Sequence, residues 1–177
     1  MDKTGDWGKE RNSQSLLYKP DRVVYSKAGS STAALGVMEL KVSYKRNPNY
    51  MTDFVKLAKQ MKLILHGLLY VGIPAFVVCG ILIQGSRCET FAMDLAYNGV
   101  YRFMRLGKAA LCLSLAEFGL FPVVFNNIVE LKDIALATAI SMEARECARQ
   151  LGQEIPAAVP LSWLRANAGF LQRVDAE

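Results

Sequence analysis

The feature that most constrains this chain is an unbroken apolar run from Leu63 to Ile83, LILHGLLYVGIPAFVVCGILI. It contains no charged side chain, and His66 is its one strongly polar member. A helix rises about 1.5 Å per residue, so a helix of this length matches the roughly 30 Å hydrocarbon core of a bilayer. The run predicts a transmembrane helix. We therefore expect a mainly α membrane protein with one span, over about 53–84.

The charge distribution indicates an orientation for this span. Residues 1–62 carry 12 Lys and Arg against 6 Asp and Glu, whereas residues 63–177 carry 9 against 10. Basic residues next to a span are retained on the inner side of the membrane. The first residues also lack the apolar segment of a secretory signal. These features predict the mitochondrial inner membrane with the N-terminus on the matrix side, and a plastid or bacterial membrane is the alternative.

The helix is predicted to begin at Thr52, which suits an N-cap, and to carry three lysines toward the span. Lys56, Lys59 and Lys62 recur every three residues and so lie near one face. We interpret them as cations at the membrane interface, with specific binding of anionic lipid as the alternative. Lysines placed directly against a span do not have the pattern of a nucleic-acid site, so no nucleic-acid partner is expected.

Within the apolar run, Gly72, Ala75 and Cys79 form a strip of small residues that predicts close packing against a neighbouring helix. His66 is interpreted as a hydrogen-bonding residue at the membrane boundary, and a haem or quinone contact is the alternative. A second polar residue of interest is Glu117, which lies in another apolar stretch, 109–125. A carboxylate inside a lipid bilayer needs a hydrogen-bonding or charged partner.

The remainder of the chain divides around the long helix assigned to 51–86. Residues 1–50 form a polar N-terminal arm with possible strands at 22–26 and 37–45, which either pair as a hairpin or extend along a partner. Residues 87–127 are assigned to amphipathic or interfacial helices, one of them over 89–106. A further apolar stretch, 109–125, is a buried or interfacial helix or, alternatively, a second span. C-terminal helices are expected over 128–177, the first ending before Gly152.

The sequence carries no pattern that predicts a catalytic or metal site. The four cysteines, Cys79, Cys88, Cys112 and Cys147, contain no C-x-x-C pair, and no G-x-G-x-x-G, phosphate-binding loop or H-E-x-x-H is present. With a single histidine, a serine–histidine–carboxylate site is improbable. We expect no cofactor and no independent enzyme.

These features together predict a non-catalytic accessory subunit of a large mitochondrial inner-membrane complex, either of the respiratory chain or ATP synthase. Its expected partners are other subunits of that complex and the lipid bilayer. Two alternatives stay open. One is a proton-pathway or transport component that uses Glu117 and His66, and the other is a membrane-tethered adaptor or assembly factor.

Overall fold

The computed structural model describes residues 19–41, 52–73, 76–96, 99–153 and 159–164, and these form one mixed sheet with two α-helices. The strand order is β1-β2-β3-β4-β5. Neighbouring strands are antiparallel except β2 and β3, which are parallel and are joined through α1. The elements are β1 (Arg22–Ala28), β2 (Ser31–Lys41), α1 (Asp53–Val71), β3 (Val78–Gln84), β4 (Arg87–Ala96), β5 (Val100–Ala110), η2 (Leu115–Leu120), α2 (Phe121–Gln150) and η3 (Leu161–Trp163).

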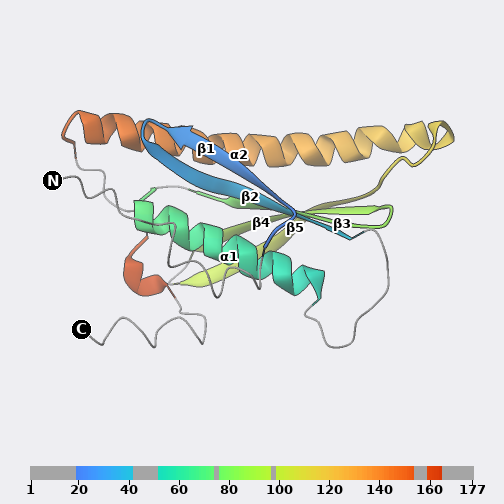
Figure 1. The fold of residues 1–177 in the computed structure, drawn as a ribbon, viewed down its shortest axis with the longest axis horizontal. Coiled ribbons are helices and arrows are strands. Elements are labelled where there is room, and N and C mark those ends of the chain that lie inside the picture. The colour runs from blue at the N-terminus through green and yellow to red at the C-terminus, as the bar shows by residue number, and fades with distance from the viewer. Residues whose placement is uncertain (1–18, 42–51, 74–75, 97–98, 154–158, 165–177) are drawn as a thin grey trace.

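The two helices cover opposite faces of the sheet, so the molecule has three layers (Figure 1). On one face, a Cβ added to Gly80 would meet the side chains of Met61 and Leu57 on α1. On the other, the Cys79 thiol donates to the Leu131 carbonyl of α2 at 3.5 Å. Because side chains alternate along a strand, adjacent residues of β3 contact different helices. Strand β3 is therefore covered on both faces.

The core lies between α1 and the sheet. The Thr52 side chain caps the helix by accepting from the Val55 N–H at 3.4 Å, as the sequence predicts. The apolar stripe of α1 is buried completely or almost completely. Each of its side chains stabilises the fold by about 1.5–3 kcal/mol because it is removed from water. The stripe consists of Leu57, Met61, Leu65, Leu68 and Leu69.

The prediction that 63–83 is one membrane-spanning helix is wrong. Residues 63–71 are the second half of α1, which ends at Gly72 in the left-handed conformation with φ 76°. Residues 78–83 belong to β3, a strand buried by helices on both faces. A strand of that kind reads as a continuous apolar run, and periodicity does not separate it from a buried helix. The run is a helix, a turn and a central strand.

The predicted amphipathic helix over 89–106 is also wrong, because this stretch forms most of the β4–β5 hairpin. Asp94 and Arg102 are two charged residues of this stretch, eight positions apart. They lie opposite each other in the antiparallel register, and the Arg102 Nε donates to the Asp94 carboxylate at 2.8 Å. Two polar residues eight positions apart can lie near one side of a helix, after slightly more than two turns, or opposite each other in a hairpin. The spacing therefore does not distinguish a helix from a hairpin.

Residues 109–125 form neither a buried helix nor a span. They comprise the end of β5, a connection, η2 and the start of α2, and nearly all of them from Leu113 onward are exposed. Across the part of the chain that the structure describes, no helix is long and apolar enough to cross a membrane. The assignment as a mainly α membrane protein is therefore corrected to a mixed five-stranded sheet with two helices.

Other predicted segments fall partly on described residues. Strand 22–26 lies inside β1, and the described part of 37–45 is the end of β2. Residues 128–150 lie in α2, and Gly152 follows its end with φ 69°. Most of the polar N-terminal arm and most of the expected last helix, 165–177, lie outside the described residues.

Candidate functional site

A polar cluster fills the space between β2 and the start of α1. Glu39 is 4% exposed and faces the helix, where its carboxylate accepts from the Lys56 Nζ and the Gln60 Nε2, each at 2.6 Å. Removing a carboxylate from water is costly unless it is paired and hydrogen-bonded, and both conditions hold here. The cluster therefore attaches α1 to the sheet through charge as well as through apolar contact.

The same end of the sheet carries a second ion pair. Asp53, in the first turn of α1, lies 3.0 Å from the Lys41 Nζ and accepts from the Gln84 amide at 3.3 Å. Sequence reasoning missed both groups. The available signal was a polar face, Glu39 and Lys41, on an alternating strand, together with Lys56 and Gln60 one helical turn apart. These carboxylates are each bonded to a cation or an amide of this chain.

His66 is placed at the other end of α1, against the last strand. Its Nε2 lies 2.6 Å from the Tyr101 hydroxyl on β5. Burial, together with the smaller effect of the nearby Lys62 charge, lowers the pKa of His66 to about 4. The imidazole is therefore neutral at pH 7. The Lys62 ammonium lies 4.5 Å from the centre of the Tyr101 ring, a distance suited to a cation–π contact.

The residues predicted to face lipid or a neighbouring helix have other surroundings. Lys56 and Lys62 contact Glu39 and Tyr101 as described, and Lys59 is half-buried. The predicted strip of small residues is divided: Gly72 ends α1, Cys79 lies in β3, and Ala75 lies outside the described residues. Gly72 is covered by Arg145 of α2, whose Nε donates to the Val71 carbonyl at 2.8 Å.

Glu117 lies in η2, on a different element from His66. Its carboxylate accepts from the Leu113 backbone N–H at 2.8 Å, and its own carbonyl accepts from the Cys112 thiol at 3.1 Å. Both interactions are local and solvent-exposed. They fix the connection between β5 and η2, and the structure does not bring Glu117 and His66 together.

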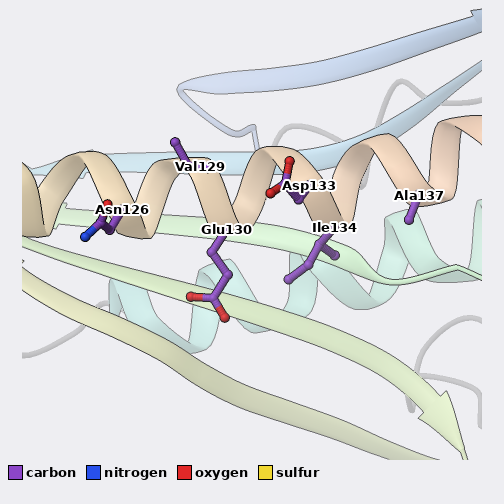
Figure 2. A pocket seen from close by; sticks show the side chains of 6 residues that line it. All are labelled: Asn126, Val129, Glu130, Asp133, Ile134 and Ala137. Carbon is purple, nitrogen blue, oxygen red and sulfur yellow. The ribbon is translucent and has the colours of Figure 1, made fainter.

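A hollow of about 510 Å³ lies along α2, a volume in the range of small-ligand sites. Figure 2 shows its lining residues, among them Glu130 and Ile134, which point to one side of the helix, and Asp133, which points to another. All of the lining residues come from α2 itself. No other element that the structure describes closes the hollow, so among these residues it is part of the helix surface. Among the described residues, no group of three or more His, Cys, Asp or Glu side chains has an arrangement that could hold a metal ion.

The most unusual surface of the molecule is apolar and surrounds η2. We call it the apolar shoulder and define it as Leu113, Leu115, Phe118, Leu120, Phe121 and Val123. Their exposed fractions run from 41% for Leu120 to 93% for Leu115. The yellow N-terminal end of α2 extends past the strands in Figure 1, so the sheet cannot cover these side chains. Large apolar side chains left exposed over so short a segment make the shoulder a candidate interaction surface.

Aromatic rings give the shoulder a defined shape. Phe118 and Phe121 are stacked with ring centres 5.6 Å apart, and Phe121 and Phe125 follow at 5.9 Å. The rings therefore form a continuous exposed row across the junction of η2 and α2. The sequence signal was present, since these residues lie in the apolar stretch 109–125, but that stretch was assigned to lipid or to a core.

Comparison with protein families, with curated proteins and with solved structures finds no match for this chain. The function proposed next rests on the residues of the shoulder and on the polar groups described above.

Proposed function

We propose that this protein is a non-catalytic subunit that joins a larger protein assembly through the apolar shoulder. The observation that carries the proposal is the exposure of Leu115, Leu113 and Phe118, at 93%, 71% and 64%. Burying each of these side chains in an interface would contribute on the order of 1.5–3 kcal/mol before the costs of association are subtracted. In the isolated chain this contribution is not realised.

The chemistry of the shoulder indicates the kind of partner. Glu117 is the only charged residue between Leu113 and Val123, and its carboxylate is already engaged by the Leu113 N–H. A row of phenylalanine rings supplies large, rigid contact area, which is typical of the residues that dominate interface energies. The partner surface is therefore an apolar groove or helix face of another protein, with little charge at its centre.

The non-catalytic part of the proposal is supported by how the polar side chains are used. Glu39, Asp53 and Glu146 each bond to cations or amides of the same chain, and His66 contacts a tyrosine. Glu39 and Asp53 hold α1 on the sheet, whereas Glu146 bonds to Arg149 and Gln150 within α2. A transport role for His66 and Glu117 would need the two groups on one pathway, and they lie on separate elements with separate partners.

The test is a paired substitution in the cell that makes the protein. The double variant Leu115→Asp/Phe118→Asp places two charges on the shoulder, and Tyr70→Asp is the matched control because Tyr70 is an exposed aromatic residue on α1. The protein is purified under native conditions from these cells and measured by native mass spectrometry. The wild type and the control should each appear in a complex of fixed stoichiometry with another polypeptide, and the double variant should appear without that polypeptide. The same species for all three chains, or a chain without partners in every case, would overturn the proposal.

A further inference from the structure

The outward side of α2 carries a second apolar surface, which begins at Phe125, next to Phe121 of the shoulder. Leu131, Thr138 and Met142 mark the side of α2 that is buried against the sheet. On the opposite side lies a row that we call the outer strip, which is at least partly exposed along its whole length. The outer strip consists of Phe125, Val129, Leu136, Ile140, Cys147 and Leu151, and four of the six are more than half exposed.

The spacing of the outer strip is symmetric along the chain. Its members follow one another at intervals of four, seven, four, seven and four residues. Four plus seven is eleven residues, which is close to three turns, so the row stays on one side of a nearly straight helix. The same intervals are read in both directions. A second copy of α2, running antiparallel about an axis through position 138, thus presents the same row of side chains.

We propose that two copies of this chain associate through the outer strips of their α2 helices, antiparallel and about a two-fold axis that is level with residue 138 but lies on the helix side opposite the buried Thr138 side chain. This arrangement places Leu136 of each copy opposite Ile140 of the other. Val129 then lies opposite Cys147, and Phe125 opposite Leu151. Every apolar residue of the strip meets an apolar residue, so one symmetric interface covers them all.

The charges beside the strip agree with this orientation. In an antiparallel helix pair, each flank faces the same flank of the other copy. Lys132 and Glu143 lie on one flank, six and five residues from the axis, so Lys132 of one copy lies beside Glu143 of the other. Lys132 is exposed and lies 2.7 Å from Asp133 in its own chain. The opposite flank carries Asp133 beside the small residues Ala137 and Ala144, and the two alanines permit close approach.

The size of the interface sets the expected affinity. The strip spans 26 residue steps, which is about 39 Å of helix, and a contact about 10 Å wide covers roughly 400 Å² per copy. Stable interfaces bury about 800 Å² per partner, so an interface of about half that size predicts a weak, reversible dimer. The pairing uses none of the six shoulder residues, so it does not depend on the function proposed above.

Sedimentation velocity of the full chain, over a concentration series, tests the pairing. The wild type should shift from monomer to dimer with rising concentration, and Ile140→Asp should stay monomeric. Leu113→Asp is the control, because this exposed leucine belongs to the shoulder, and it should dimerise like the wild type. Lys132→Glu should weaken dimerisation by about tenfold, and the added change Glu143→Lys should restore it. A wild type that is monomeric throughout the series, or variants that all dimerise equally, would overturn the proposal.

A cross-link tests the antiparallel register independently of affinity. Val129→Cys places a thiol opposite Cys147 of the second copy, and copper–phenanthroline as oxidant should then join the two thiols in a disulfide with loss of two protons and two electrons. In the wild type, the two Cys147 thiols lie 18 residue steps apart across the axis, or about 27 Å, too far for a bridge. A disulfide-linked dimer in the variant and its absence in the wild type are expected. No linked dimer at a concentration where sedimentation shows dimers would overturn the register.

Discussion

The two helices of this protein use their apolar residues in opposite ways. In α1, the stripe from Leu57 to Leu69 is turned to the sheet, and Leu57, Met61 and Leu65 have no exposed surface. In α2, a few residues such as Leu131 and Met142 contact the sheet, while Leu136 and Ile140 are more than half exposed on the other side. The outer side of α1 also exposes apolar residues, among them Leu63 at 40% and Tyr70 at 67%, so the two helices differ in how much of their apolar surface the sheet covers.

This difference shows where the fold is complete and where it needs a partner. The sheet covers the main apolar stripe of α1, from Leu57 to Leu69. A helix that is apolar on more than one side is satisfied only when something covers the second side. The same holds for η2, whose leucines and phenylalanines have no covering element among the described residues. The α1 side therefore maintains the fold, and the α2 side provides contact surface.

The largest effect expected from this comparison is on stability. Leu65→Ala, on the buried side of α1, should lower the free energy of unfolding by about 2–5 kcal/mol, because it removes buried methyl groups and leaves a cavity. Leu115→Ala, the same change on the shoulder, should change it by less than about 0.5 kcal/mol. Urea denaturation of the purified variants measures both. Similar losses for the two would mean that the shoulder is part of the core.

A smaller contrast is expected between the two glycines that end the helices. Both have positive φ, 76° at Gly72 and 69° at Gly152, so alanine is strained by about 1–2 kcal/mol at either position. A Cβ at Gly72 would also collide with the Arg145 guanidinium, whereas nothing lies within 4 Å at Gly152. Gly72→Ala should thus destabilise by about 1 kcal/mol more than Gly152→Ala in thermal unfolding, because displacing the Arg145 side chain removes its hydrogen bond to the Val71 carbonyl. The reverse order would contradict the close approach of α2 to the end of α1.

The smallest effect is a difference in how stability depends on pH, between His66 on α1 and Glu146 on α2. His66 has a folded-state pKa of about 4 because of burial, below the unfolded value of about 6.5. The unfolded chain therefore binds the proton first, and stability falls as pH drops from about 6.5 toward 4. On α2, hydrogen bonds from Arg149 and Gln150 lower the pKa of Glu146 to about 2, so its contribution is lost only between about 4.5 and 2.

Unfolding measured at pH 7, 5 and 3 separates the two groups. His66→Gln should remove part of the stability loss between pH 7 and 5, and Glu146→Gln should remove part of the loss between pH 5 and 3. An unchanged profile in the His66 variant would show that the imidazole is not held neutral against β5.

Local signals in the sequence were sufficient for helix ends. Thr52 and Gly152 are assigned correctly because a cap depends on the residue itself and on its nearest neighbours along the chain. The alternation of β2 was also visible, but its polar face is the one that meets α1. Glu39 is buried and Leu40 is 48% exposed, because Lys56 and Gln60 on α1 provide the partners that a carboxylate requires.

The long apolar segments were misassigned because their meaning depends on tertiary contacts. The same run, 63–83, satisfies the length of a membrane span and the composition of a helix followed by a central strand. Only the pairing of β3 with β2 and β4 distinguishes the two. The stretch 109–125 is apolar in either interpretation, and its exposure became apparent only when α2 was placed past the end of the sheet.

In-cell photo-cross-linking tests the central claim most directly, namely that the shoulder is a contact surface for another protein. A photoreactive p-benzoylphenylalanine is placed at Phe118 on the shoulder or, in a separate chain, at Tyr70 on α1, two aromatic positions with 64% and 67% exposure. Irradiation should give one discrete adduct with another polypeptide from position 118 and none from position 70. No adduct from position 118, or the same adducts from both positions, would contradict the account.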